Sequence, residues 1–204
     1  DANFLLERLT PSIIAYTESG TAFSNYSQMR LRGIDQSRIN ITLNGVPLND
    51  MIDQGVFFSN FTDFGNSIET VQVQRGVGTS SHGTSSFAGS INFESIHLQN
   101  TEPGSELQLT AGSFGSYRAS VEANTGLQKN KTAFYTRLSR IYSDGFRDNT
   151  STDSWSMMFS GAYFGDKDII KFTAFTGKSN NGLAYLPVAE SDILANPRTN
   201  YLNE

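Results

Sequence analysis

The sequence predicts a mainly β protein in two parts, a small domain of short strands followed by a sheet of long ones. Gly, Ser, Asn and Thr are abundant, whereas strong helix formers are scarce. Up to about residue 100, short β-branched runs are separated by glycines and an Asn-Gly turn signal at Asn44-Gly45. Beyond that point, long runs alternate apolar and polar side chains, which is typical of strands with two different faces.

Composition excludes several classes of protein. The 204 residues carry 15 Lys and Arg against 20 Asp and Glu, a net charge of -5, which argues against a nucleic-acid binder. Without cysteine there is no disulfide framework or thiolate metal site. No apolar run reaches the roughly 18 residues of a transmembrane helix, but a transmembrane β-strand needs only about 9–11. No basic segment followed by an apolar one opens the sequence, so we expect no signal peptide and a chain that begins inside a domain.

The first hundred residues predict short elements. Leu5, Leu6 and Leu9 share one face of a helical turn that Pro11 ends. We expect a further short helix at residues 63–67, with Asp63 as a candidate cap. The expected strands are residues 12–16, 28–31, 39–43, 70–74 and 90–94, with loops at 34–37 and 48–60.

The rest of the chain predicts five long strands, at residues 106–114, 118–127, 132–142, 154–164 and 169–178. Their connections alternate between tight turns and longer loops, as in outer-membrane barrels, whose periplasmic turns are short and extracellular loops long. An ordinary soluble meander would show the same alternation, because one of its faces packs on a core. In a barrel we expect Leu107, Val121, Phe134, Leu138, Trp155, Phe159 and Phe172 to point outward and Glu122, Asn124, Arg137 and Lys171 inward.

Several spaced motifs lie in the first part. They are R-x-R-G at residues 30–33, Arg38, N-G-x-P-x-N-D at 44–50, E-x-V-x-V-x-R-G at 69–76 and S-I-N at 90–92. In combination they resemble the plug domain of TonB-dependent outer-membrane receptors, over about residues 3–95. The resemblance implies a small mixed α+β plug domain (1–97, N-terminal part missing) inside the start of an antiparallel transmembrane β-barrel (98–204, about five strands).

The resemblance also implies a larger protein. Transporters of this kind have 22 strands around a plugged lumen. Strands of roughly 10 residues would then need about 220 residues before any loop. We therefore expect the chain to be a fragment that needs the remainder of its own barrel.

What the resemblance implies about function is TonB-dependent active uptake of a scarce ligand across a Gram-negative outer membrane. A ferric siderophore or other iron chelate is the first expectation, on its frequency in the family. An oligosaccharide or cobalamin, or a receptor acting mainly in signalling or surface assembly, are the alternatives. A soluble β-sandwich adhesin fragment would instead show a closed apolar core and no plug. The expected partners are TonB of the inner-membrane energy-coupling complex, an extracellular small molecule and outer-membrane lipid. No enzyme activity, cofactor or nucleic acid is expected.

Two groups of site residues follow from the resemblance. By position, the plug tips that face the extracellular side are expected to bind ligand through Asp35, Gln36, Asn49, Asp50, Asp53, Gln54, Phe57 and Phe58. The alternative for Phe57 and Phe58 is packing under the loop. The plug arginines Arg32, Arg38 and Arg75 are expected to pair with carboxylates of the barrel wall, which suits a bidentate guanidinium. Asp50 and Asp53 have no His or Cys nearby, so no metal site is assigned, and His82 and His97 are expected to lack carboxylate partners.

Overall fold

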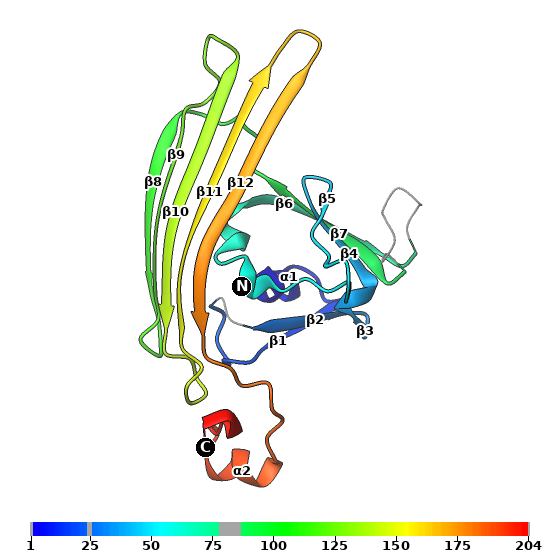
Figure 1. Cartoon of the computed structure of the whole chain (residues 1–204), viewed down its shortest axis with the longest axis vertical. Coiled ribbons are helices and arrows are strands. Elements are labelled where there is room, and N and C mark those ends of the chain that lie inside the picture. The colour runs from blue at the N-terminus through cyan, green and yellow to red at the C-terminus, as the bar shows by residue number, and fades with distance from the viewer. Residues whose placement is uncertain (1, 24–25, 78–86, 204) are drawn as a thin grey trace.

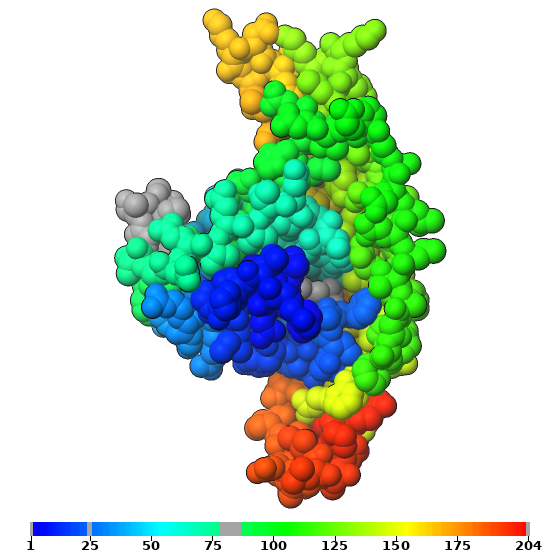
Figure 2. All heavy atoms as spheres, turned by 180° about the vertical axis from the view of Figure 1, so that it is seen from behind, coloured from blue at the N-terminus to red at the C-terminus, as the bar shows by residue number. Residues whose placement is uncertain are grey.

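The computed structural model describes residues 2–23, 26–77 and 87–203. Five long strands form a curved sheet, and the N-terminal half of the chain lies against its concave side (Figure 1). We call this sheet the wall and residues 2–97 the N-terminal domain. Seen from behind, the blue and cyan N-terminal domain lies beside the green strands of the wall, and the orange to red C-terminal segment lies at one end (Figure 2). Within the described residues, no helix has the length and apolarity needed to span a membrane.

The wall is an antiparallel meander whose strands pair in chain order. Its strands are β8 (Gly104–Ala111), β9 (Tyr117–Asn124), β10 (Thr132–Ser143), β11 (Thr152–Phe164) and β12 (Ile169–Asn181). Residues 125–131 and 165–168 connect strands at what we call the turn end, at the top of Figure 1. Residues 112–116, 144–151 and 182–203 lie at the opposite, loop end, and the last of these segments carries α2 (Glu190–Ala195) and η5 (Tyr201–Asn203).

The N-terminal domain has two small sheets. Helix α1 (Ala2–Leu9) precedes a three-stranded sheet of β1 (Ile13–Thr17), β2 (Ser27–Leu31) and β3 (Ile34–Asp35). The second sheet has the order β5-β4-β7-β6, from β4 (Ile39–Leu43), β5 (Val46–Pro47), β6 (Ile68–Arg75) and β7 (Gly89–Ser95). Among the strands that the structure describes, only β4 and β7 pair in parallel. The described part of the domain also has three short 3-10 turns: η1 (Gln36–Arg38), η2 (Phe58–Asn60) and η3 (Phe64–Ser67).

One apolar core holds the N-terminal domain together. Leu6 of α1, Leu31 of β2, Ile41 of β4 and Phe93 of β7 are fully buried in it. Gly89 starts β7 at φ +154°, and a Cβ there would lie 2.3 Å from the carbonyl oxygen of Gln74. Glycine is therefore required where β7 meets β6, which accounts for the glycine before the S-I-N motif.

The wall has the opposite distribution of polarity. Apolar side chains such as Leu107, Leu138 and Phe172 are exposed on its convex side. The side chains that face the N-terminal domain include buried Arg137, Ser139, Ser154, Ser156 and Ser160. The period-two alternation predicted from the sequence is therefore present in the wall strands.

Several strand ends differ from the sequence prediction, and two ends in the wall illustrate the causes. The first wall strand stops at Ala111 because Phe114 (φ 59°) and Gly115 (φ 61°) take left-handed conformations in the turn to β9. The last extends to Asn181 because its final residues continue to pair with the start of β11, where Thr152 lies opposite Asn181. Neither the turn conformation nor the length of pairing with the partner strand can be predicted from the local sequence.

Candidate functional site

The first predicted tip is a rigid turn. The Asp35 carboxylate accepts hydrogen bonds from the backbone N–H of Ser37 at 3.0 Å and from its hydroxyl at 2.8 Å, so Asp35 caps η1. These bonds, the backbone one first, lower the pKa of Asp35 below its ordinary value, because they favour the ionised form. The Gln36 amide donates to the carbonyl of Val56, which joins this turn to the second predicted tip.

The second tip, residues 48–57, is held by its own polar side chains. The Asn49 side chain accepts from the N–H of Ile41 at 2.8 Å and donates to the carbonyls of Ile39 at 2.9 Å and Gln54 at 2.7 Å. Asn49 therefore anchors the loop to β4. Gln36 and Asn49 therefore support the loops, although the Gln36 Oε1 atom is buried and has no hydrogen-bond partner among the described residues.

The outer part of this loop carries carboxylates and apolar side chains together. Asp50 accepts from the N–H of Ile52 at 2.7 Å, and Asp53 accepts from the N–H of Gly55 at 2.8 Å. Both aspartates are exposed, and between them Met51 and Ile52 are each 93% exposed. The sequence prediction omitted Met51 and Ile52, although two adjacent apolar residues between loop carboxylates are a recognisable signal.

The two neighbouring phenylalanines have different environments. Phe57 is 49% exposed, whereas Phe58 is 3% exposed and packs with its ring centroid 6.0 Å from those of Phe64 and Phe93. The prediction that Phe58 contacts ligand is therefore not supported, because its ring belongs to the core of the N-terminal domain. The alternative of packing under the loop applies to Phe58 and not to Phe57.

The three predicted lock arginines make no ion pair with any carboxylate that the structure describes. Arg32, Arg38 and Arg75 are all exposed. Arg32 (φ 54°) and Gly33 (φ 82°) form the turn between β2 and β3, where the Arg32 N–H donates to the Ser12 carbonyl at 2.8 Å. The R-x-R-G motif thus has a local structural role in this turn.

The observed ion-pair contact with the wall has the reverse polarity. Asp63 of the N-terminal domain is buried, and its Oδ2 lies 3.2 Å from Arg118 Nε and 3.2 Å from Arg137 Nη2. Ser139 also donates to this oxygen, and Arg137 Nη2 donates to the Asp63 backbone carbonyl at 2.6 Å. Residues of β9 and β10 therefore bind one carboxylate of the N-terminal domain.

Asp63 was predicted only as a helix cap, and that role is wrong. It precedes η3 in a left-handed conformation (φ 56°) and makes no side-chain cap hydrogen bond. Its carboxylate instead faces the two wall arginines, because a buried charge needs compensation that a single backbone amide does not supply. The contact joins residues 55 or more positions apart, so no local motif predicts it.

An aromatic contact lies beside this cluster. Phe175 of β12 places its ring centroid 6.1 Å from that of Phe61 and 6.3 Å from that of Phe64. The phenylalanine core of the N-terminal domain thus continues onto the wall. The two parts are therefore joined by aromatic packing as well as by the ion pairs of Asp63.

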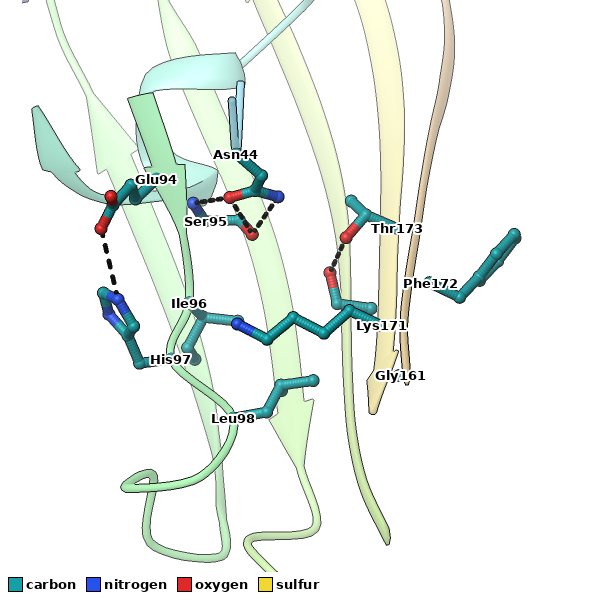
Figure 3. A pocket seen from close by; sticks show the side chains of 11 residues that line it. Asn44, Glu94, Ser95, Ile96, His97, Leu98, Gly161, Lys171, Phe172 and Thr173 are labelled. Atoms are coloured by element: carbon teal, nitrogen blue, oxygen red, sulfur yellow. Dashed lines mark hydrogen bonds and ion pairs between the residues drawn. The ribbon is translucent and has the colours of Figure 1, made fainter. Parts of the chain in front are cut away.

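His97, where the N-terminal domain passes into the wall, has two carboxylate partners, contrary to prediction. Its Nδ1 lies 3.1 Å from Glu69 and its Nε2 lies 3.3 Å from Glu94. Beside it is a cavity of about 250 Å³ that is also lined by Asn44 and by Lys171 of β12. In Figure 3, Lys171 reaches toward Ile96 while Phe172 points away, as the alternation predicts. His82 lies outside the described residues.

A curved wall of antiparallel strands, apolar outside and polar inside, with a small domain on its concave face, defines this chain as part of an outer-membrane β-barrel with an internal domain. Residues 1–90 match the family model described as TonB-dependent Receptor Plug Domain. Residues 1–90 are thus a TonB-dependent receptor plug domain, and the plug and the wall together have the fold of receptors of this kind from the bacterial outer membrane.

Solved structures have the same fold. The chain is similar to the ferric citrate transporter FecA in the unliganded form (TM-score 0.72, 15% identity), covering 93% of this chain and 30% of that one. It is similar to the ferric yersiniabactin uptake receptor FyuA from Yersinia pestis (TM-score 0.67, 18% identity), where the match covers 87% of this chain and 29% of that one. It is also similar to the copper transporter OprC (TM-score 0.66, 20% identity), where the match covers 86% of this chain and 32% of that one. The chain therefore spans about a third of each, and comparison with curated protein sequences gives no match.

Proposed function

We propose that the complete protein takes up a scarce ligand across the outer membrane, driven by TonB. The observation that carries this proposal is the plug domain itself, bound to the inner face of a wall through the buried Asp63 cluster. A domain held inside a barrel by a few specific contacts can be displaced by force applied from the periplasm. Lipid contact on the convex face and completion of the barrel by further strands belong to the same proposal.

A ferric siderophore or other iron chelate is the proposed cargo. Its support is that two of the similar structures are named as handling ferric yersiniabactin and ferric citrate. A third similar structure is named as a copper transporter, so its name also refers to a metal but does not specify a chelate. Oligosaccharide and cobalamin remain the alternatives.

The test is uptake by cells that express the full-length receptor as their only candidate carrier. Radioactive iron supplied as ferric citrate and as ferric siderophores should accumulate in cells with TonB and not in an otherwise identical strain that lacks it. Equal accumulation in both strains would contradict TonB dependence. Accumulation of labelled cobalamin or oligosaccharide in place of iron would replace the proposed cargo.

We propose that the two predicted tips, residues 34–37 and 48–57, which the hydrogen bond from Gln36 to Val56 joins, form the ligand-contact surface of the plug. Asp35, Asp50, Asp53 and Phe57 would contact cargo, with Met51 and Ile52 added. Gln36, Asn49 and Gln54 would hold the loops in shape. For Arg32, Arg38 and Arg75, we propose partners in barrel strands beyond residue 204.

Phe57 and Phe58 form a matched pair of variants for this surface. Phe57→Ala should weaken binding of the transported ligand with little change in plug stability, because its ring is half exposed. Phe58→Ala should destabilise the plug by about 3–5 kcal/mol, because it leaves a cavity in the core. Ligand titration and protease sensitivity of the plug, measured on both full-length variants, separate these effects. Normal ligand binding by Phe57→Ala would show that the Phe57 ring is not part of the ligand-contact surface.

A further inference from the structure

Residues 96–103, which connect β7 of the plug to β8 of the wall, are attached to both parts. Leu98 is 5% exposed and packs against Ala133, Tyr135 and Ala162 of the wall. Its neighbour His97 instead lies against carboxylates of the plug strands. In Figure 3 the side chains of His97 and Leu98 point to different sides of the connection. His97 is therefore the residue through which the connection is held to the plug.

The His97 imidazole lies between two carboxylates. Its Nδ1 is 3.1 Å from Glu69 Oε2 on β6, and its Nε2 is 3.3 Å from Glu94 Oε2 on β7. An ionised carboxylate only accepts hydrogen bonds, and a neutral imidazole has a single N–H. The neutral ring can therefore donate to one of these partners, whereas the imidazolium ion can donate to both.

Other donors fix the positions of the two carboxylates. Glu69 Oε2 also accepts from the backbone N–H of His97 at 2.6 Å. Glu94 accepts from the Thr70 hydroxyl at 3.1 Å and from the Asn92 amide at 3.3 Å. Both glutamates are thus held as acceptors on the two sides of the ring, and the protonation of the ring decides how many of these contacts become hydrogen bonds.

The other titratable groups around the ring come from the wall. Lys171 of β12 lines the cavity beside the imidazole. Glu122 of β9 and Tyr135 of β10 line the adjoining cavity together with Glu69. Of these groups only Lys171 is cationic, and the glutamates in direct contact with the ring are anionic. The His97 side chain is 43% exposed, so it can exchange protons with solvent.

We infer that Glu69, His97 and Glu94 form a pH-dependent clasp between the plug and its connection to the wall. Histidine is the side chain whose charge ordinarily changes between about pH 5 and 8. When the imidazole is protonated, two charge-assisted hydrogen bonds join β6 and β7 to the connection, and one of them is lost when the imidazole becomes neutral. The plug is therefore attached more firmly in mildly acidic than in neutral surroundings. This inference goes beyond the proposed uptake and does not depend on the cargo.

The position of the clasp determines which movement it opposes. The His97 carbonyl accepts from the N–H of Asn100 at 3.2 Å and from the Thr101 hydroxyl at 2.8 Å, so the turn that leads to β8 is built on the same residue. Because Leu98 is packed on the wall, movement of β6 and β7 away from the wall would pull on the connection at His97. Loss of one hydrogen bond there lowers the resistance to this movement and leaves the pairing of the wall strands intact.

The test is amide hydrogen exchange of residues 96–101 in the purified full-length receptor, measured by mass spectrometry and corrected for the intrinsic pH dependence of exchange. Protection should be several-fold greater at about pH 5.5 than at about pH 7.5. His97→Gln should abolish this difference, because glutamine does not titrate, and Glu94→Gln should reduce it. His82→Gln, which changes the other histidine of the chain, is the matched control and should retain the difference. Residues 128–132 at the turn end contain no histidine and are the internal reference.

Equal protection at the two pH values would overturn the inference. So would a pH difference that persists in both His97→Gln and Glu94→Gln. If His97 were only a structural contact, His97→Gln would lower protection by the same factor at both pH values, and this result would also refute the clasp. Uptake in strains with and without TonB tests the proposed function separately, so the two proposals fail in different measurements.

Discussion

The plug and the wall place polar and apolar side chains in opposite ways. In the plug, Leu31, Ile41 and Phe93 are fully buried, whereas Asp50 and Asp53 of the second tip are exposed. In the wall, Leu107 is 68% exposed on the convex face while Ser154 and Ser156 are buried on the concave one. The plug is thus organised around its own core, whereas the wall is organised by strand pairing between an apolar convex face and a polar concave face.

The contact between the plug and the wall combines polar and apolar interactions. Asp63 and Arg137 form a buried ion pair, while Phe61 and Phe175 continue the aromatic core onto the wall. If the plug is displaced during uptake, as the proposed function requires, a contact that depends on one charge would suit that step. Loss of that charge leaves two arginines uncompensated, whereas a purely apolar contact would lose stability gradually.

The largest expected effect comes from this ion cluster. Asp63→Ala should destabilise the plug–wall contact by about 3–5 kcal/mol, because the buried Arg137 and the partly buried Arg118 remain without their carboxylate. Protease sensitivity of the plug in the full-length protein measures the effect. Asp166→Ala is the control, since Asp166 pairs with Lys131 at the exposed turn end and such pairs are worth about 0–1 kcal/mol. Equal protease sensitivity of the two variants would show that Asp63 does not hold the plug.

A smaller effect on stability should distinguish the two faces of the wall, which should differ in their tolerance of an arginine side chain. Leu138→Arg on the convex face should cost about 2–4 kcal/mol near the bilayer midplane. Thr173→Arg, which faces the cavity beside Lys171, should cost well under half of that, since its charge meets a polar space. Unfolding of the full-length barrel in lipid vesicles measures both. Equal tolerance of arginine at the two positions would refute the assignment of the faces.

The smallest effect concerns the first plug loop. Because hydrogen bonds from Ser37 lower the pKa of Asp35 in the folded plug, this carboxylate stabilises the fold above its unfolded pKa. That stabilisation is lost as the pH falls through the folded-state pKa, which lies below the ordinary aspartate value of 3.8. Asp35→Asn should therefore reduce the loss of plug stability between about pH 5 and 2, by less than about 1 kcal/mol, because the group is mostly exposed. Identical pH profiles of the two proteins would contradict this.

The sequence by itself determined the mainly β fold, the alternation of the wall strands and the plug motifs. These properties are local, because period-two patterning and turn residues such as Asn44-Gly45 act through neighbouring backbone. The five wall strands were predicted with ends shifted by up to three residues, as for residues 106–114 against the observed Gly104–Ala111. Strand ends depend on the partner strand and on turn conformation, which local patterns do not contain.

Only the tertiary structure decided which residues join the plug to the wall and which ring is free. Asp63 meets Arg137 across 74 positions, and the energy of that contact comes from shared burial that neither segment has alone. Phe57 and Phe58 look alike in sequence, yet η2 begins between them and turns one ring into the core. His97 likewise gains its two glutamates from β6 and β7, whose antiparallel pairing brings both carboxylates to the same place.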